Sequence, residues 1–79
     1  MREFNIAIQS FGEIREFVAK ATVQPFQVMV GNDAQLVNAK SFIGMVSLDY
    51  SRPLRVLCDC DGDGDGFQRF RQQVSRFLA

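Results

Sequence analysis

Two different spacings of apolar residues alternate along this chain, and their order is the strongest constraint on its fold. In three short stretches every second residue is apolar, which is typical of half-buried strands, and a turn signal predicts a fourth strand that pairs with the second. In three others the apolar residues recur every three or four positions, which is typical of amphipathic helices. The predicted strands cover residues 4–8, 26–30, 35–39 and 54–58, and the predicted helices cover residues 11–21, 41–48 and 67–78.

The resulting order, β-α-β-β-α-β-α, excludes a doubly wound parallel sheet. It fits an α+β open-faced sandwich, in which a four-stranded antiparallel sheet carries the helices on one face. Pro25 ends the first long helix, and the turn residues 31–33 join the second and third strands into a hairpin. With no linker or repeat, we expect one domain over residues 1–79, with a small core.

Charge and composition exclude several classes of function. Nine Lys and Arg residues balance nine Asp and Glu residues, so the formal net charge is zero. This balance argues against nucleic acid or an anionic membrane as a partner. The first residues lead directly into a strand pattern, with no signal segment and no long apolar run, so we expect a cytoplasmic protein.

The chain has two cysteines and no histidine. Cys58 and Cys60 lie two residues apart, so on a strand they point to the same face and diverge, and a disulfide between them would be strained. A zinc site would need further ligands, and no histidine can supply one. We expect buried, reduced thiols, no metal site and no cofactor.

Two serines stand where predicted helices begin. Ser10 and Glu13 form the Ser-x-x-Glu pattern of a capping box at the start of the first long helix. Ser41 can cap the short helix 41–48. That helix has more large apolar side chains than one short turn can hide, so part of it is expected to form a docking surface. These side chains are Phe42, Ile43, Met45 and Val46.

The run from Asn38 to Tyr50 resembles HPr, the histidine-containing phosphocarrier of the bacterial sugar phosphotransferase system (PTS). The matching pattern is Lys-Ser-apolar-apolar-Gly-x-x-Ser-Leu, which begins at Lys40. The resemblance covers nearly the whole chain and runs without gaps from Ser10 to Ser41. It implies an HPr-like fold, protein partners and a phosphocarrier rather than an enzyme.

The resemblance also implies that the family's chemistry is missing. Ser10 falls at the position of the phosphate-carrying histidine and Gly12 at that of an arginine, so the family's His-x-Arg-Pro motif reads Ser-Phe-Gly-Glu here. A serine hydroxyl without an adjacent base is a weak nucleophile. Glu13 and Glu16 would repel a phosphate at the same turn. The chain thus resembles a degenerate HPr-like member that cannot act as a histidine phosphocarrier and has no catalytic residue.

Ser41 falls where HPr proteins of Gram-positive type have a regulatory serine. In that family a dedicated serine kinase phosphorylates this residue, and the product docks on a transcriptional regulator of carbon catabolism. The resemblance implies that Ser41 is a regulatory phosphorylation site, next to the partner-binding residues Lys40, Phe42, Ile43 and Val46. In the structural alternative, Ser41 is only a helix cap and Phe42 and Val46 fill the core.

The acidic run from Asp59 to Asp65 suggests a different function. Read from Asp61, it has carboxylates at the first, third and fifth positions of a calcium loop, but Gln72 stands where the last ligand should be glutamate. Asp65 can instead cap the last helix. Two hypotheses follow. The first is a protein-binding regulatory module that docks through helix 41–48, as a monomer or weak homodimer. The alternative is a small cation- or ligand-binding domain that uses the acidic loop 59–65.

Overall fold

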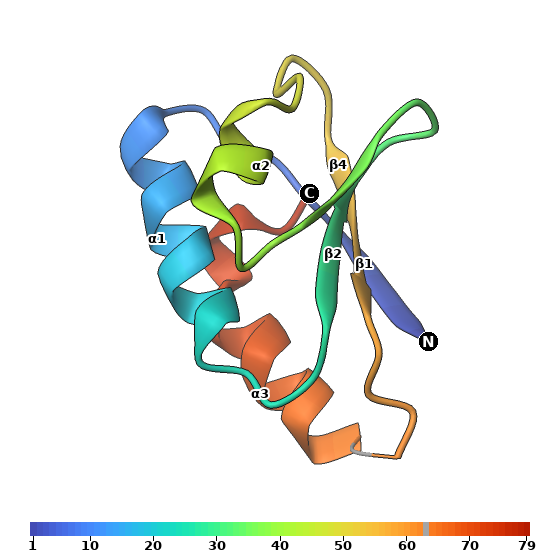
Figure 1. Cartoon of the computed structure of the whole chain (residues 1–79). Coiled ribbons are helices and arrows are strands. Elements are labelled where there is room, and N and C mark those ends of the chain that lie inside the picture. The colour runs from blue at the N-terminus through green and yellow to red at the C-terminus, as the bar shows by residue number, and fades with distance from the viewer. Residues whose placement is uncertain (63) are drawn as a thin grey trace.

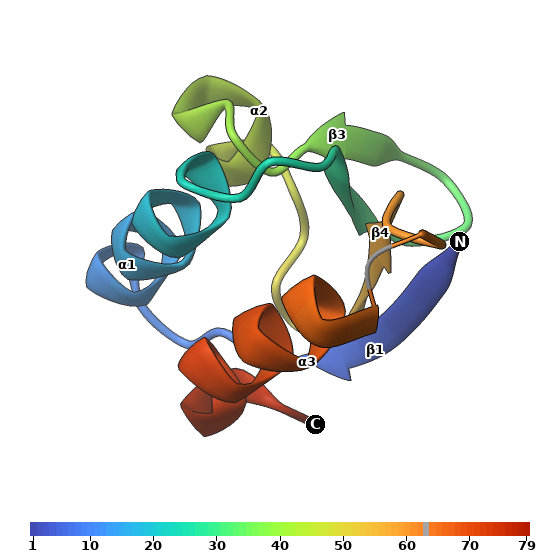
Figure 2. The ribbon, with the colours of Figure 1, turned by 90° about the horizontal axis from the view of Figure 1, so that it is seen from below.

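The computed structural model describes residues 1–62 and 64–79. Its four strands form one antiparallel sheet in the order β1-β4-β2-β3. The helices lie together on one face of this sheet (Figures 1 and 2). The predicted α+β open-faced sandwich is therefore confirmed. The strands are β1 (Arg2–Ile6), β2 (Val28–Gly31), β3 (Leu36–Asn38) and β4 (Leu54–Cys58), and the helices are α1 (Phe11–Thr22), α2 (Phe42–Val46) and α3 (Gly64–Gln73).

The core lies between the sheet and the helices, and phenylalanines dominate it. Phe70 of α3 is fully buried. Its ring lies 5.9 Å from that of Phe4 and 6.1 Å from that of Phe26, both edge-on, and 5.8 Å from that of Phe17. Rings at these separations add a specific geometry to the area that they bury. The helices are thus fixed against the sheet by one central aromatic cluster.

Strand β1 ends two residues before the sequence pattern predicts. Its pairing with β4 stops at Ile6 opposite Leu54. Pro53 immediately precedes Leu54 in the sequence, and proline has no N–H to donate to a further pair of the sheet. Ile8 is nevertheless buried, so the alternation of apolar residues continues past the strand. Here the alternation of apolar residues correctly predicts which side chains are buried, but not where the pairing of the strands ends.

The end of the chain also differs from the prediction of one continuous helix. Helix α3 starts at Gly64, so Asp65 lies in its first turn and is not its cap. The helix stops at Gln73, and a 3-10 turn (Ser75–Phe77) follows. Leu78 then forms a bridge with Ile6, and the N–H of Ala7 donates to the carbonyl oxygen of Phe77 at 2.7 Å. The last residues thereby cover part of the outer edge of β1.

Candidate functional site

The start of α1 is held by a capping box, close to the form that the sequence predicts. The Ser10 hydroxyl accepts a hydrogen bond from the N–H of Glu13 at 3.2 Å. The Glu13 carboxylate reaches back and accepts from the N–H of Gln9 at 2.9 Å, one residue earlier than in the standard motif. The Ser10 oxygen is therefore used to cap the N-terminus of α1.

An arginine from the far end of the chain pairs with the two glutamates in the first turns of α1. The Arg76 guanidinium lies 2.8 Å from the Glu16 carboxylate and 3.5 Å from that of Glu13. Arg76 belongs to the predicted last helix, and the sequence gives no sign of this contact. Arg76 and Glu16 are 60 residues apart in the sequence, so no local pattern signals the pairing. The negative charge expected at the start of α1 is thus partly compensated.

Gly12 occupies an open position in the first turn of α1. A Cβ atom built at Gly12 would meet only the Ser10 hydroxyl oxygen, at 4.0 Å, and its backbone does not require glycine because no residue has a positive φ among those described. The fold itself does not explain the glycine.

Ser41 caps α2, as predicted, although the helix (Phe42–Val46) ends two residues before the predicted bound at Leu48. The exposed Ser41 hydroxyl accepts from the N–H of Gly44 at 3.2 Å. The ammonium group of the neighbouring Lys40 donates to the carbonyl oxygen of Gln24 at 2.8 Å, which ties this segment to the end of α1. Both the cap and the adjacent cation that the sequence places here are therefore present. Lys40 is only half-exposed.

The apolar side chains of α2 divide between core and surface. Met45 is fully buried, whereas the side chain of Ile43 is 78% exposed. Phe42 and Val46 are half-buried and pack against the edge of the core. The sequence left open whether Phe42 and Val46 fill the core or form a docking surface. In the structure they do part of each, because they pack against the core and remain partly accessible.

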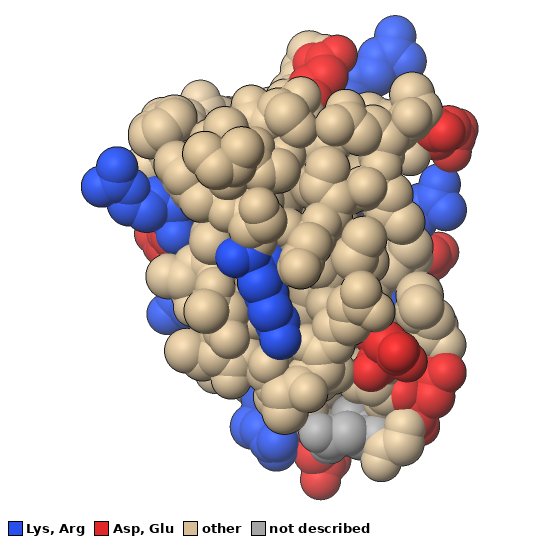
Figure 3. Space-filling view, in the orientation of Figure 1, with Lys and Arg blue, Asp and Glu red and all other residues tan. Residues whose placement is uncertain are grey.

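A contact between two rings joins α1 and α2 into one surface. The Phe11 and Phe42 rings are 5.2 Å apart and nearly perpendicular, and Phe11 is 56% exposed. We call the surface formed by Phe11, Phe42, Ile43 and Val46 the α1–α2 face. Figure 3 shows that the surface over α2 is uncharged and that Lys and Arg side chains lie toward its edges. Sequence reasoning missed Phe11, because its helical spacing predicts a buried position.

A hollow of about 300 Å³ borders this face at the start of α1. The Tyr50 hydroxyl closes one wall by donating to the carbonyl oxygen of Met45 at 2.6 Å, and burial raises the pKa of Tyr50 to about 12. The phenol therefore stays protonated at neutral pH and serves as a structural group. The hollow is lined by Ile8, Gln9, Ser10, Phe11, Ile14 and Tyr50.

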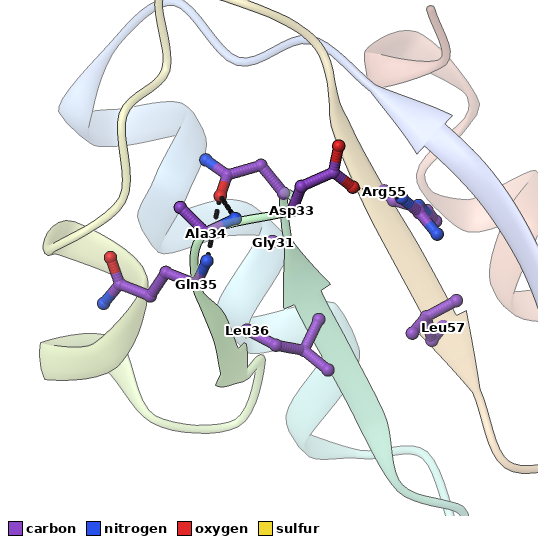
Figure 4. Close-up of a pocket in the computed structure, with 8 residues that line it drawn as sticks. Gly31, Asp33, Ala34, Gln35, Leu36, Arg55 and Leu57 are labelled. Atoms are coloured by element: carbon purple, nitrogen blue, oxygen red, sulfur yellow. Dashed lines mark hydrogen bonds and ion pairs between the residues drawn. The ribbon is translucent and has the colours of Figure 1, made fainter.

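A second hollow, of about 380 Å³, lies beside the hairpin between β2 and β3 (Figure 4). Its polar groups are used within the turn. The Asn32 side-chain oxygen accepts from the N–H groups of Ala34 and Gln35, and Arg55 pairs with Asp33 at 3.1 Å. These contacts explain the turn, and they bring together no group suited to catalysis.

The described part of the acidic run 59–65 does not have the arrangement of a calcium loop. Helix α3 already includes Asp65, which cannot then belong to a continuous ligand loop. Asp61 pairs with the ammonium group of Met1 at 2.5 Å. Asp63 lies outside the described residues. Within the described part of the chain, no three His, Cys, Asp or Glu side chains are grouped closely enough to hold a metal ion.

The two cysteines are buried and reduced, as predicted. The Cys60 thiol donates to the carbonyl oxygen of Cys58 at 3.7 Å. Burial, with a smaller contribution from Cys60, raises the pKa of the Cys58 thiol to about 12. A thiol with so high a pKa is inert at neutral pH, so Cys58 is a core residue.

Comparisons with known proteins support the fold. No protein-family model matches this sequence, and no curated protein matches it at a significant level. Among solved structures, it is similar to HPr-C-His from Thermoanaerobacter tengcongensis. The similarity has a TM-score of 0.70 and 24% identity, and covers 95% of this chain and 92% of that chain. The architecture is therefore HPr-like. Among the described residues, no helix is both long and apolar enough to span a membrane.

Proposed function

We infer that this chain is a PTS-related, HPr-like protein that binds other proteins and does not carry phosphate on a histidine. One observation carries the proposal. An HPr-like fold is combined with a sequence of 79 residues that contains no histidine. The function that this combination leaves is recognition, and the exposed α1–α2 face is the surface suited to it.

The start of α1 supports the loss of phosphotransfer. Ser10, at the expected position of the phosphohistidine, uses its hydroxyl oxygen as the helix cap. Gly12, at the expected position of the arginine, offers no cation. Arg76 comes closest to replacing that charge, but it is paired with Glu13 and Glu16. Without a base near Ser10, we propose a binding protein and not an enzyme.

The proposed docking surface is centred on helix 41–48. Phe42, Ile43 and Val46 supply its apolar contacts, and Lys40 lies at its edge. The proposed partners are proteins, namely the serine kinase of the PTS or a transcriptional regulator of carbon catabolism, in the cytoplasm. Neither nucleic acid nor a membrane is proposed, because the formal net charge is zero.

Phosphorylation of Ser41 is the proposed control. The hydroxyl is exposed and already accepts from the N–H of Gly44, in the first turn of α2, where the N–H groups have no partner within the helix. A phosphate there would accept hydrogen bonds from these groups and would place a negative charge beside Ile43. The modification would therefore change the chemistry of the docking surface without requiring a new fold.

The test is incubation with ATP and the PTS serine kinase, followed by intact mass and site mapping. We expect one phosphate, lost in Ser41→Asn, which keeps a capping side chain and so preserves the helix. Ser47→Ala is the matched control, because Ser47 lies at the other end of the same helix. A kinase that modifies ordinary HPr but leaves this protein unmodified would eliminate the Ser41 control.

A further inference from the structure

We propose that the face of the sheet opposite the helices binds a segment of a partner protein that combines basic and apolar side chains. The helices lie on one face of the sheet, and no described segment covers the other (Figures 1 and 2). We call this second surface the open sheet face. The sheet separates it from the α1–α2 face, so this proposal does not depend on the proposed function.

The pairing of the strands places the side chains of the open sheet face in two rows. Their neighbours along each strand point toward the core, because successive side chains of a strand alternate between faces. Gln27 and Asp59 continue the pattern, since the N–H of Asp59 donates to the carbonyl oxygen of Gln27 at 3.0 Å. The first row is Glu3, Leu57, Met29 and Asn38, and the second is Asn5, Arg55, Gly31 and Leu36.

Apolar side chains occupy the middle of these rows. Leu36 is 48% exposed, and Leu57 and Met29 are partly exposed. Gly31 lies between Leu36 and Arg55 and has no side chain, so the hollow of about 380 Å³ opens there (Figure 4). A Cβ atom at Gly31 would collide with the hairpin backbone, so the fold itself maintains this recess. The open sheet face thus offers a partner an apolar centre with room for a side chain.

Carboxylates surround this apolar centre. Glu3 and Asp59 are exposed and form no ion pair with a described residue. Asp33 lies at the hairpin end, where it pairs with Arg55 at 3.1 Å. Arg55 is the only cation among the described side chains of the two rows. Three carboxylates therefore face one guanidinium, although the formal net charge of the whole chain is zero.

This distribution of charge selects the partner. A segment with Lys or Arg beside apolar residues complements both the negative rim and the apolar centre. A second copy of the chain is disfavoured in a symmetric pairing through this face, because its carboxylates would meet like charges. Nucleic acid and anionic membranes are disfavoured for the same reason. The open sheet face is therefore assigned to a basic segment of another protein.

The test uses a short synthetic peptide in which Lys alternates with Leu and Val, and the same peptide with Glu in place of Lys. Binding is followed by the backbone amide NMR shifts of the whole chain. We expect the Lys peptide to shift Met29, Leu36 and Leu57, with a dissociation constant on the order of 0.1–1 mM. Added salt should weaken this binding, because the carboxylates are exposed. The Glu peptide should leave these amides unchanged.

Two pairs of variants assign the binding to this face. Neutralising its rim with Glu3→Gln and Asp59→Asn together should weaken the Lys peptide by roughly threefold or more. Asp49→Asn is the matched control, because Asp49 is an exposed carboxylate that belongs to neither row. Leu36→Ser should also weaken binding, whereas Val23→Ser, at a side chain 74% exposed beside the end of α1, should not.

Three results would overturn the proposal: no shifts with the Lys peptide, equal binding of the Glu peptide, or equal losses in a variant and its control. Shifts confined to the α1–α2 face would overturn it as well. Because the kinase assay on Ser41 uses the other side of the molecule, either proposal can fail while the other stands.

Discussion

Phenylalanines form two clusters in this molecule, and the clusters have opposite relations to water. Phe70 is fully buried and contacts three other rings, from β1, from α1 and from the segment before β2. Phe11 and Phe42 make one edge-on contact of the same kind, but they make it at the surface. The ring geometry is alike in both places, so it does not distinguish a core from an interface.

The two clusters differ in what surrounds them. Phe70 is fully buried, and rings from β1, from α1 and from the segment before β2 pack around it. Around Phe11 the Phe42 ring lies at 5.2 Å and the Arg15 guanidinium at 5.9 Å, and the residue remains 56% exposed. The same residue type thus stabilises the fold in one cluster and remains available for binding in the other.

The largest expected effect is the loss of the central ring. Phe70→Ala should reduce the free energy of unfolding by about 3–5 kcal/mol, because it removes three aromatic contacts and leaves a cavity. Phe11→Ala should cost less than about 1 kcal/mol, because the ring is already half in water. Urea unfolding of both variants measures the comparison. If Phe70→Ala does not fold, Phe70→Leu should show a smaller loss in the same direction. Equal losses for Phe11 and Phe70 would contradict the division into surface and core.

Alkaline pH tests the buried side of the comparison through a different group. The pKa of Cys58 rises from 9.0 to about 12 on folding, because burial disfavours the thiolate. The folded state therefore binds the proton more tightly, and this contribution to stability is complete below pH 9.0. It is lost as the pH rises toward 12. Thermal unfolding followed across this range should show a falling melting temperature.

Burial also raises the pKa of Tyr50, from 10.0 to about 12. Two groups therefore contribute to the fall in stability at alkaline pH. Cys58→Ala removes one of them. Its melting temperature should be lower at neutral pH, because a buried side chain is truncated, but should fall less steeply above pH 9.0. Parallel profiles for the two proteins would show that Cys58 titrates as it does in the unfolded chain.

The smallest effect concerns the capping box that positions Phe11. Ser10→Ala removes the acceptor for the Glu13 N–H and should reduce stability by about 1 kcal/mol. Ser75→Ala, at an exposed serine that caps no α-helix, is the control and should be nearly neutral. Amide hydrogen exchange should quicken in the first turn of α1 and stay unchanged at Phe70. Uniform quickening would mean that the two clusters are not independent.

Most of the fold could be predicted from the sequence, because the spacing of apolar residues within a segment indicates whether it forms a strand or a helix. The alternation at Leu54, Val56 and Cys58 predicts a strand with one buried face, and the structure buries all three. The serines at both helix starts were also predicted, since a cap depends on only four consecutive residues. The ends of elements were less accurate. Pro53, which faces the end of β1 across the sheet, cannot be recognised from the residues of β1 themselves.

The candidate site could be predicted only in part. Ile43 and Phe42 were predicted as surface residues because a short helix cannot hide them. Phe11 was not, because its spacing fits the buried stripe of α1. Arg76 gave no local signal, since its pairing with Glu13 and Glu16 depends on the final turn packing beside α1.

By itself, the sequence determined the kinds of elements, their order, the helix caps and the absence of histidine, because these depend on neighbouring residues or on composition. Only the tertiary structure decided which apolar side chains would be covered. Burial depends on what packs above a side chain, and for Phe11 and Phe70 those neighbours come from distant parts of the chain. The α1–α2 face exists because the fold brings Phe11 to Phe42 and leaves Phe11 56% exposed, with the Arg15 guanidinium 5.9 Å from its ring centre.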